Sequence, residues 1–168
     1  MIIDARTVFK AIRNISPHWD GSASQIHVVN IEISELQNVL NIVASSIHDI
    51  KCTPQEIMPH DFSLLEIHRT LNQGETPLIG GMFDEERSLQ CWIWLNSDQS
   101  LIDIELVYWA DEFFPKKMTY EETLVSFTTL YDMTTKLRTL TLGVDCIYSA
   151  NEVGDPDQER DKLHTYVW

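Results

Sequence analysis

The sequence predicts an α+β fold, a largely antiparallel sheet with helices packed on one face, in a single domain over residues 1–168. Two observations predict it. Helical and strand-like apolar periods alternate along the chain, and several strand-like runs follow one another closely enough to form hairpins. Apolar residues make up 43% of the sequence, which is enough for a core, and no low-complexity tract or linker divides the chain.

The first elements are a helix, a strand and a second helix. Residues 4–13 carry apolar side chains at helical spacing behind Asp4, which can serve as the N-cap. The β-branched run 26–33 predicts a strand. An apolar stripe from Leu36 to Ile47 then predicts a helix that ends near Asp49.

The middle of the chain is less regular. Residues 52–60 hold two prolines and are expected to form a connector. The apolar positions of 62–71 fit neither period cleanly, and we assign this segment to a strand. In the run 78–83, Gly80-Gly81 indicates a bulge or a close backbone approach, because no lysine follows in the manner of a phosphate-binding loop.

A hairpin is the best-defined feature of the sequence. Residues 88–95 and 101–109 are β-rich runs separated by five polar residues, and each run alternates between an apolar face and a mixed face. The mixed face carries aromatic residues beside acids, namely Trp92, Trp94 and Trp109 with Asp103 and Glu105.

Residues 111–115 are expected to break the second strand of this hairpin. A helix then begins near Met118, with acids in its first turn, and ends near Arg138 with basic residues, as the helix dipole favours. Residues 140–148 predict a last strand, and 151–162 predict a polar loop or a short surface helix. The aromatic residues at the end of the chain indicate that this terminus docks on the fold.

The charge balance is extreme, with 26 acidic and 12 basic residues and a net charge of -14. An anion of this density repels phosphates and anionic lipids, so nucleic acids and membrane surfaces are poor partners and a basic protein is a better one. The chain starts without a signal-like segment and has no apolar run of membrane-spanning length, so we expect a cytoplasmic protein. Three widely spaced cysteines predict no disulfide framework.

The acids are densest between Asp84 and Glu112, where eight of them stand against the single base Arg87. We predict that this segment forms a partner-binding surface. A solvated surface without any partner, and aromatic residues that serve core packing, remain the alternatives. The predicted contact residues are Asp84, Glu85, Glu86, Asp103, Glu105, Asp111 and Glu112, with Trp94 and Trp109 as aromatic anchors.

A small acidic α+β chain with scattered cysteines resembles, at the level of the class, the acidic immunity proteins that bacteria carry beside polymorphic or contact-dependent toxins. The resemblance rests on the overall charge and on the acidic and aromatic segment 84–114, and it assigns no individual residue. It implies a cytoplasmic protein that neutralises a cognate toxin, often a nuclease, by covering its basic active-site surface. It implies neither a cofactor nor catalytic or metal-binding residues.

Two other function classes remain open. A metal-dependent hydrolase could use His60, Asp61, Glu66 and His68, because these are transition-metal ligand types and Glu66 and His68 share one face if their segment is a strand. An adaptor subunit of a larger assembly is the other. No serine-hydrolase elbow, zinc-protease motif or phosphate-binding loop is present in the sequence.

Overall fold

The computed structural model describes residues 3–15, 23–53, 64–143, 146–149 and 165–168. They form an α+β architecture built on one sheet of seven strands, in the order β2-β3-β4-β5-β1-β6-β7, and every pairing is antiparallel. The strands are β1 (Ala23–Glu32), β2 (His48–Thr53), β3 (Leu78–Met82), β4 (Ser88–Leu95), β5 (Leu101–Trp109), β6 (Cys146–Ser149) and β7 (Thr165–Val167).

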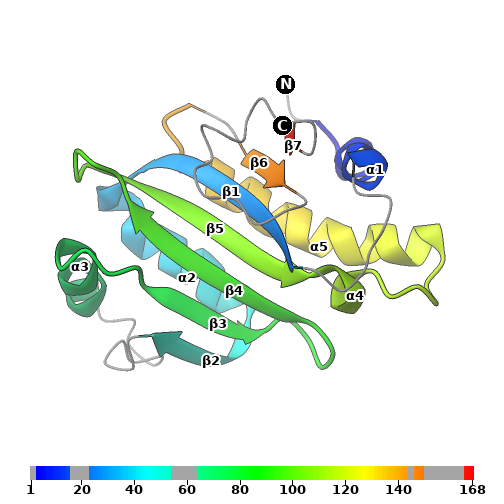
Figure 1. Ribbon diagram of the computed structural model, residues 1–168, viewed down its shortest axis with the longest axis horizontal. Coiled ribbons are helices and arrows are strands. Elements are labelled where there is room, and N and C mark those ends of the chain that lie inside the picture. The colour runs from blue at the N-terminus through cyan, green and yellow to red at the C-terminus, as the bar shows by residue number, and fades with distance from the viewer. Residues whose placement is uncertain (1–2, 16–22, 54–63, 144–145, 150–164) are drawn as a thin grey trace.

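Helices cover one face of this sheet, as the sequence predicts. The helices are α1 (Ala5–Ile15), α2 (Leu36–Ser46) after the 3-10 turn η1 (Ile33–Glu35), α3 (Leu64–Asn72), α4 (Ala110–Phe113) and α5 (Tyr120–Arg138). In Figure 1, α2 and α5 lie behind the sheet, and α1 lies beyond its β7 edge. The face toward the viewer is therefore left free of these helices.

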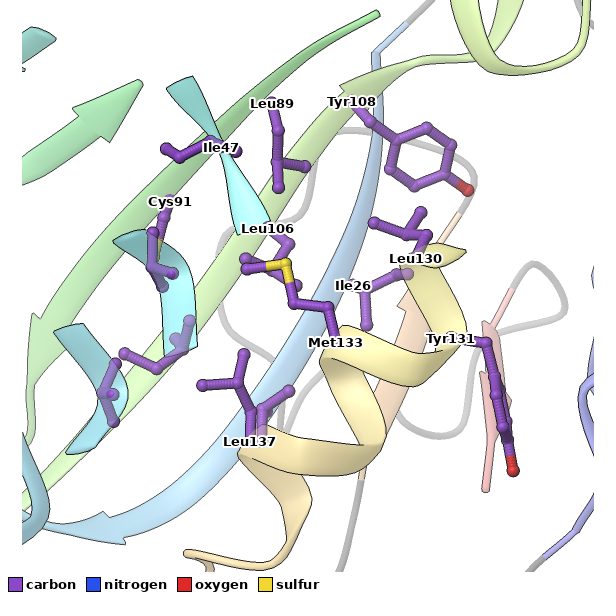
Figure 2. Close-up of a cluster of buried hydrophobic side chains, with 14 of the residues drawn as sticks. Ile26, Ile47, Leu89, Cys91, Leu106, Tyr108, Leu130, Tyr131, Met133 and Leu137 are labelled. Atoms are coloured by element: carbon purple, nitrogen blue, oxygen red, sulfur yellow. The ribbon is translucent and has the colours of Figure 1, made fainter. Parts of the chain in front are cut away.

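The core lies between the sheet and α5. Figure 2 shows Leu130, Met133 and Leu137 of α5 pointing toward Leu106 and Ile26 of the sheet. All five side chains are at most 2% exposed. Burial of such side chains contributes about 1.5–3 kcal/mol each, so this layer holds the helix to the sheet.

The predicted hairpin is confirmed with both strand limits. Leu89 pairs with Tyr108 and Trp94 with Asp103, so side chains directly opposite one another share a face. Cys91, Ile93 and Ile104 lie in the core, while the mixed face turns away from the helices.

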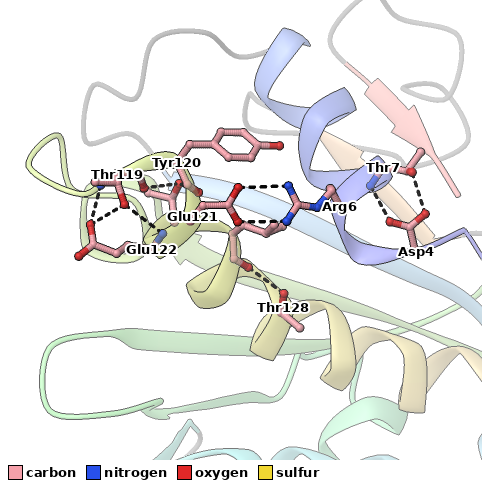
Figure 3. Close-up of polar contacts among 10 residues, drawn as sticks. Asp4, Arg6, Thr7, Thr119, Tyr120, Glu121, Glu122 and Thr128 are labelled. Atoms are coloured by element: carbon pink, nitrogen blue, oxygen red, sulfur yellow. Dashed lines mark hydrogen bonds and ion pairs between the residues drawn. The ribbon is translucent and has the colours of Figure 1, made fainter.

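Side-chain hydrogen bonds cap the N-termini of α1 and α5, and an ion pair joins these two helices (Figure 3). Asp4 accepts hydrogen bonds from the backbone nitrogen and the hydroxyl of Thr7, at 3.1 and 2.8 Å, and so caps α1 as predicted. Thr119 and Glu122 form a capping box at the start of α5. Arg6 reaches across to Glu121 with two hydrogen bonds of 3.2 and 3.0 Å.

The assignment of residues 62–71 to a strand is wrong, because the described part of this segment belongs to α3. Its buried residues Ile67, Thr70 and Leu71 follow helical spacing. Leu65 is 75% exposed, and this apolar residue on the solvent side obscured the helical period in the sequence.

The region that follows α2, up to Thr53, also differs from the prediction. The helix ends at Ser46 rather than near Asp49, and β2 replaces the first residues of the expected connector. β2 is an outermost strand with a bulge, since His48 pairs with Met82 and Lys51 with Gly80, and Asp49 has a φ of 51°.

The expectation of a close backbone approach at Gly80-Gly81 is confirmed at Gly81. A Cβ atom added there would lie 2.7 Å from the carbonyl oxygen of His48 in β2. Only glycine fits this contact, so the close approach of β2 at its bulge requires glycine at position 81.

The predicted last strand starts later than expected. Leu140 still belongs to the turn after α5, Thr141 makes a single bridge to Ile31, and β6 begins at Cys146. The prediction that the terminus docks is confirmed, because Trp168 is 5% exposed. The polar segment 151–162 lies outside the described residues. Across the residues that the structure describes, no helix has the length and apolar character needed to cross a bilayer.

Candidate functional site

Most of the predicted contact residues separate into two places in the fold. Four of the acids line a groove formed by the β3–β4 loop, α4 and the first half of α5. Trp94, Asp103 and Glu105 lie instead on the sheet face that turns away from α2 and α5. The acidic segment of the sequence therefore does not form one continuous surface.

The first place, which we call the acidic groove, encloses about 440 Å³. Five carboxylates and one guanidinium contribute to its lining, together with two apolar side chains and a serine. The lining residues are Asp84, Glu85, Glu86, Arg87, Glu112, Met118, Glu122, Val125 and Ser126.

Arg87 is the internal support of the groove. Its Nε donates to Asp84 Oδ2 at 2.6 Å, its guanidinium bonds Ser126, and it lies over the ring of Phe113 at 5.1 Å. The hydrogen bond from Arg87 is the main cause that lowers the pKa of Asp84 below its ordinary value. The only cation among the described lining residues is thus neutralised within the protein.

Glu112 and Glu122 also have structural partners. Glu112 Oε2 accepts from the backbone nitrogen and the hydroxyl of Ser88, both at 2.7 Å, and ties α4 to the start of β4. Backbone and side-chain hydrogen bonds from Thr119 lower the pKa of Glu122, which belongs to the capping box. Both carboxylates are thus fixed in place by hydrogen bonds within the protein.

Glu85 and Glu86 differ from the other groove acids. Both are exposed, and among the described residues their side chains make no hydrogen bond or ion pair. Asp111, the next predicted contact residue, is exposed on α4 but is not a lining residue of the groove. Glu85 and Glu86 are therefore the groove carboxylates that a partner can contact without disturbing the fold.

The second place is an aromatic pair on the sheet face. The rings of Trp92 and Trp94 stack, with centroids 6.4 Å apart and planes at 25°. Trp94 Nε1 donates to Glu105 Oε2 at 2.8 Å, and Glu105 is only 7% exposed while Trp94 is 46% exposed. Asp103 accepts from the backbone nitrogen of Asn30 at 2.8 Å. On this face Trp94 is exposed, Asp103 is half-buried and Glu105 is buried.

Trp109, the second predicted anchor, lies on the same sheet face as Trp94 but at the opposite end of the hairpin. It is half-buried at the end of β5 and lines a shallow hollow of about 710 Å³ together with Gly80 and Gln90. Trp94 is not among the residues that line this hollow. The two predicted anchors therefore do not serve the same surface depression.

Sequence reasoning missed the second wall of the acidic groove, which α5 supplies through Glu122 and Val125, with Met118 from the turn before the helix. Val125 is 72% exposed. The acids at the start of this helix were recognisable in the sequence as complements to the helix dipole. Their approach to the β3–β4 loop depends on the tertiary packing of α5.

The residues of the metal-hydrolase hypothesis are only partly described. His60 and Asp61 lie outside the described residues. Glu66 and His68 are two residues apart on α3, which places them roughly 200° apart around the helix, so they do not share a face. Glu66 pairs with Arg69 at 2.7 Å. Within the described ranges, no three histidine, cysteine or acidic side chains form a group that could hold a metal.

Cys52 and Cys91 are not activated as nucleophiles. Burial, followed by the negative charge of Glu105, raises the pKa of Cys91 to about 12, and burial also raises the pKa of Cys52. Neither thiol is ionised to a useful extent at neutral pH.

Comparisons of the chain with protein-family models, curated proteins and solved structures give no match.

Proposed function

We propose that this chain is an acidic binding protein that neutralises a cognate protein toxin of the nuclease type in the cytoplasm by covering its basic active-site surface. One observation carries the proposal. The acidic groove brings five carboxylates together around a single cation that is already paired with Asp84.

Charge supports a basic protein as the partner. The chain carries a net charge of -14, and Glu85 and Glu86 present exposed carboxylates at the rim of the groove. Nuclease active sites are positive because they bind phosphates, so an acidic surface is complementary to them and competes with the nucleic acid. Such complementarity mainly accelerates association and selects the partner.

The apolar part of the groove supports a protein rather than a small cation as the partner. Val125 is 72% exposed beside Met118, and both lie among the carboxylates. Protein interfaces commonly place apolar contacts inside a polar rim, where exclusion of water strengthens the surrounding polar contacts. A basic surface with an apolar contact at its centre fits this arrangement.

The test uses the C-terminal domain of a large secreted protein encoded in the adjacent upstream reading frame. Association with this chain is followed by stopped flow at low and high salt. The groove variant Glu85→Gln/Glu86→Gln/Glu122→Gln should associate at least about tenfold more slowly at low salt and with a weaker salt dependence. Glutamine at position 122 can still serve the capping box.

A matched control removes three charges elsewhere. Glu32→Gln/Asp49→Asn/Asp132→Asn changes exposed acids that do not line the groove, and its association rate should stay within about twofold of the unmodified chain. Equal association rates for the groove variant and the control would refute the role of the groove. A neighbouring reading frame without a toxic domain, together with a stable homo-oligomer, would instead favour an adaptor subunit.

A further inference from the structure

We infer that a hollow beside Trp94 accepts one arginine side chain of the partner protein. The hollow encloses about 320 Å³ between the α3–β3 turn and the β4–β5 turn, and we call it the Trp94 hollow. The residues that matter are Leu71, Asn72, Glu75, Trp94, Asn96 and Gln99. The identity of the partner rests on the proposed function, whereas the chemistry of the hollow rests on its own residues.

The aromatic wall of the hollow is held in a fixed orientation. Trp94 is 46% exposed, yet its ring stacks on Trp92 and its indole nitrogen donates to Glu105 at 2.8 Å. A hydrogen bond from the indole to a carboxylate polarises the ring and increases the electron density on its face. A cation placed over this face is therefore bound more strongly than over an indole without such a bond.

The charge of the hollow selects a cation. Glu75 is exposed and is the only charged side chain among the described lining residues. Asn72 and Gln99 add amide oxygens that can accept further hydrogen bonds. A guanidinium is planar and has five donors, so it can stack on Trp94 and bond Glu75 together, which the ammonium of a lysine does less well.

Both walls of the hollow are formed before any partner binds. In the α3–β3 turn, the backbone nitrogen of Glu75 donates to the carbonyl of Thr70 at 3.1 Å. In the β4–β5 turn, Gln99 donates to the carbonyl of Asn96 at 3.1 Å, and Asn96 donates to Leu101 at 3.0 Å. Binding an arginine would not require these turns to become ordered, which removes a common entropic cost.

The hollow is separate from the acidic groove. Ser88, which bonds Glu112 of the groove, begins β4, and Trp94 lies six residues later on this strand. At about 3.3 Å per residue the two points are about 20 Å apart. A partner that uses both must therefore present an arginine at a distance from its main basic surface, which adds specificity to an otherwise electrostatic contact.

The probe for the test is the short peptide acetyl-Gly-Arg-Gly-amide, added at millimolar concentration to the ¹⁵N-labelled protein. The indole N–H signal of Trp94, assigned with Trp94→Phe, should shift in a saturable manner. The lysine peptide should bind at least about threefold more weakly, and the neutral citrulline peptide should leave the signal in place. Equal shifts with arginine and citrulline would overturn the inference.

Variants of the hollow give a second readout. Glu75→Gln, which leaves the aromatic stack intact, should weaken binding of the arginine peptide at least about threefold, and Trp94→Ala should abolish it. The matched controls Glu86→Gln and Trp109→Phe change the same residue types outside the hollow and should have no effect. Unchanged binding by Glu75→Gln would also overturn the inference.

Association and dissociation rates measured with the toxin domain distinguish failure of this inference from failure of the proposed function. In that complex, Trp94→Ala should accelerate dissociation and leave the association rate unchanged, whereas the groove variant slows association. If only the groove variant has an effect and the arginine peptide does not bind, the inference is wrong and the proposed function stands. If the peptide binds but no toxin domain does, the hollow stands and the proposed function is wrong.

Discussion

Replacing Glu112 by alanine tests whether the acids of the groove divide into structural and exposed members. Oε2 of Glu112 accepts two hydrogen bonds of 2.7 Å from Ser88, and both residues are half-buried. Hydrogen bonds to charged groups contribute about 1.5–3 kcal/mol each. Because the two bonds share one oxygen and are partly hydrated, we expect a combined loss of about 2–3 kcal/mol in the free energy of unfolding.

This loss corresponds to a decrease in Tm of about 4–12 °C for a domain of this size. Glu112→Gln keeps an oxygen acceptor without the charge and should lose about 1 kcal/mol. The control Glu86→Ala removes an exposed carboxylate and should stay within about 0.5 kcal/mol of the unmodified chain. The measurement is urea unfolding followed by far-ultraviolet circular dichroism. Equal urea midpoints for Glu112→Ala and Glu86→Ala, at equal m-values, would refute the division.

Two further predictions concern the sheet and the response to pH. Gly81→Ala places a Cβ atom 2.7 Å from the carbonyl oxygen of His48 and should lower the free energy of unfolding by about 1–3 kcal/mol. Gly80→Ala places a Cβ atom whose nearest neighbours lie 3.9 Å away, so it should be close to neutral in the same urea experiment. Similar midpoints for the two alanine variants would contradict the steric account. Asp84 has a pKa below its ordinary value of 3.8, so its carboxylate stabilises the fold above that pH, and this contribution is lost as the pH falls through the lower pKa of the folded state. The unfolding free energy of the unmodified chain should therefore decrease more steeply below about pH 4 than that of Asp84→Asn, and parallel pH profiles would show that Asp84 does not contribute.

Features that depend on neighbouring residues could be predicted from the sequence. The hairpin of β4 and β5 was predicted with both limits because strict alternation and a polar turn are local signals. The N-cap at Asp4 and the acidic first turn of α5 were recognised for the same reason. Each of these features requires no knowledge of what packs against it.

Elements whose signal depends on tertiary packing were missed. The helical period of α3 was obscured because Leu65 is apolar and yet exposed, so burial could not be inferred from residue type. β2 is short and mostly exposed at the edge of the sheet, and its sequence lacks the alternation that marks a half-buried strand. Its pairing with β3 identifies it only in the folded protein.

The candidate site was predicted in part, since sequence proximity located the acids of the β3–β4 loop and α4. It could not show that Glu112 bonds Ser88, 24 residues earlier, or that Asp103 bonds Asn30, 73 residues earlier. It also could not show that α5 completes the groove with Val125. These contacts join segments that are far apart in the sequence, so the charge density along the sequence does not predict them.

The bulge of β2 has a consequence for the protein at high concentration. A straight outermost strand offers an even row of amide and carbonyl groups on which further chains can stack, as in amyloid fibrils. The left-handed conformation of Asp49 interrupts that row, and the charged side chain of Lys51 stands beside the interruption. Fibril growth from the β2 edge is therefore disfavoured, and other molecules are expected to bind the side chains of this protein rather than its backbone at that edge.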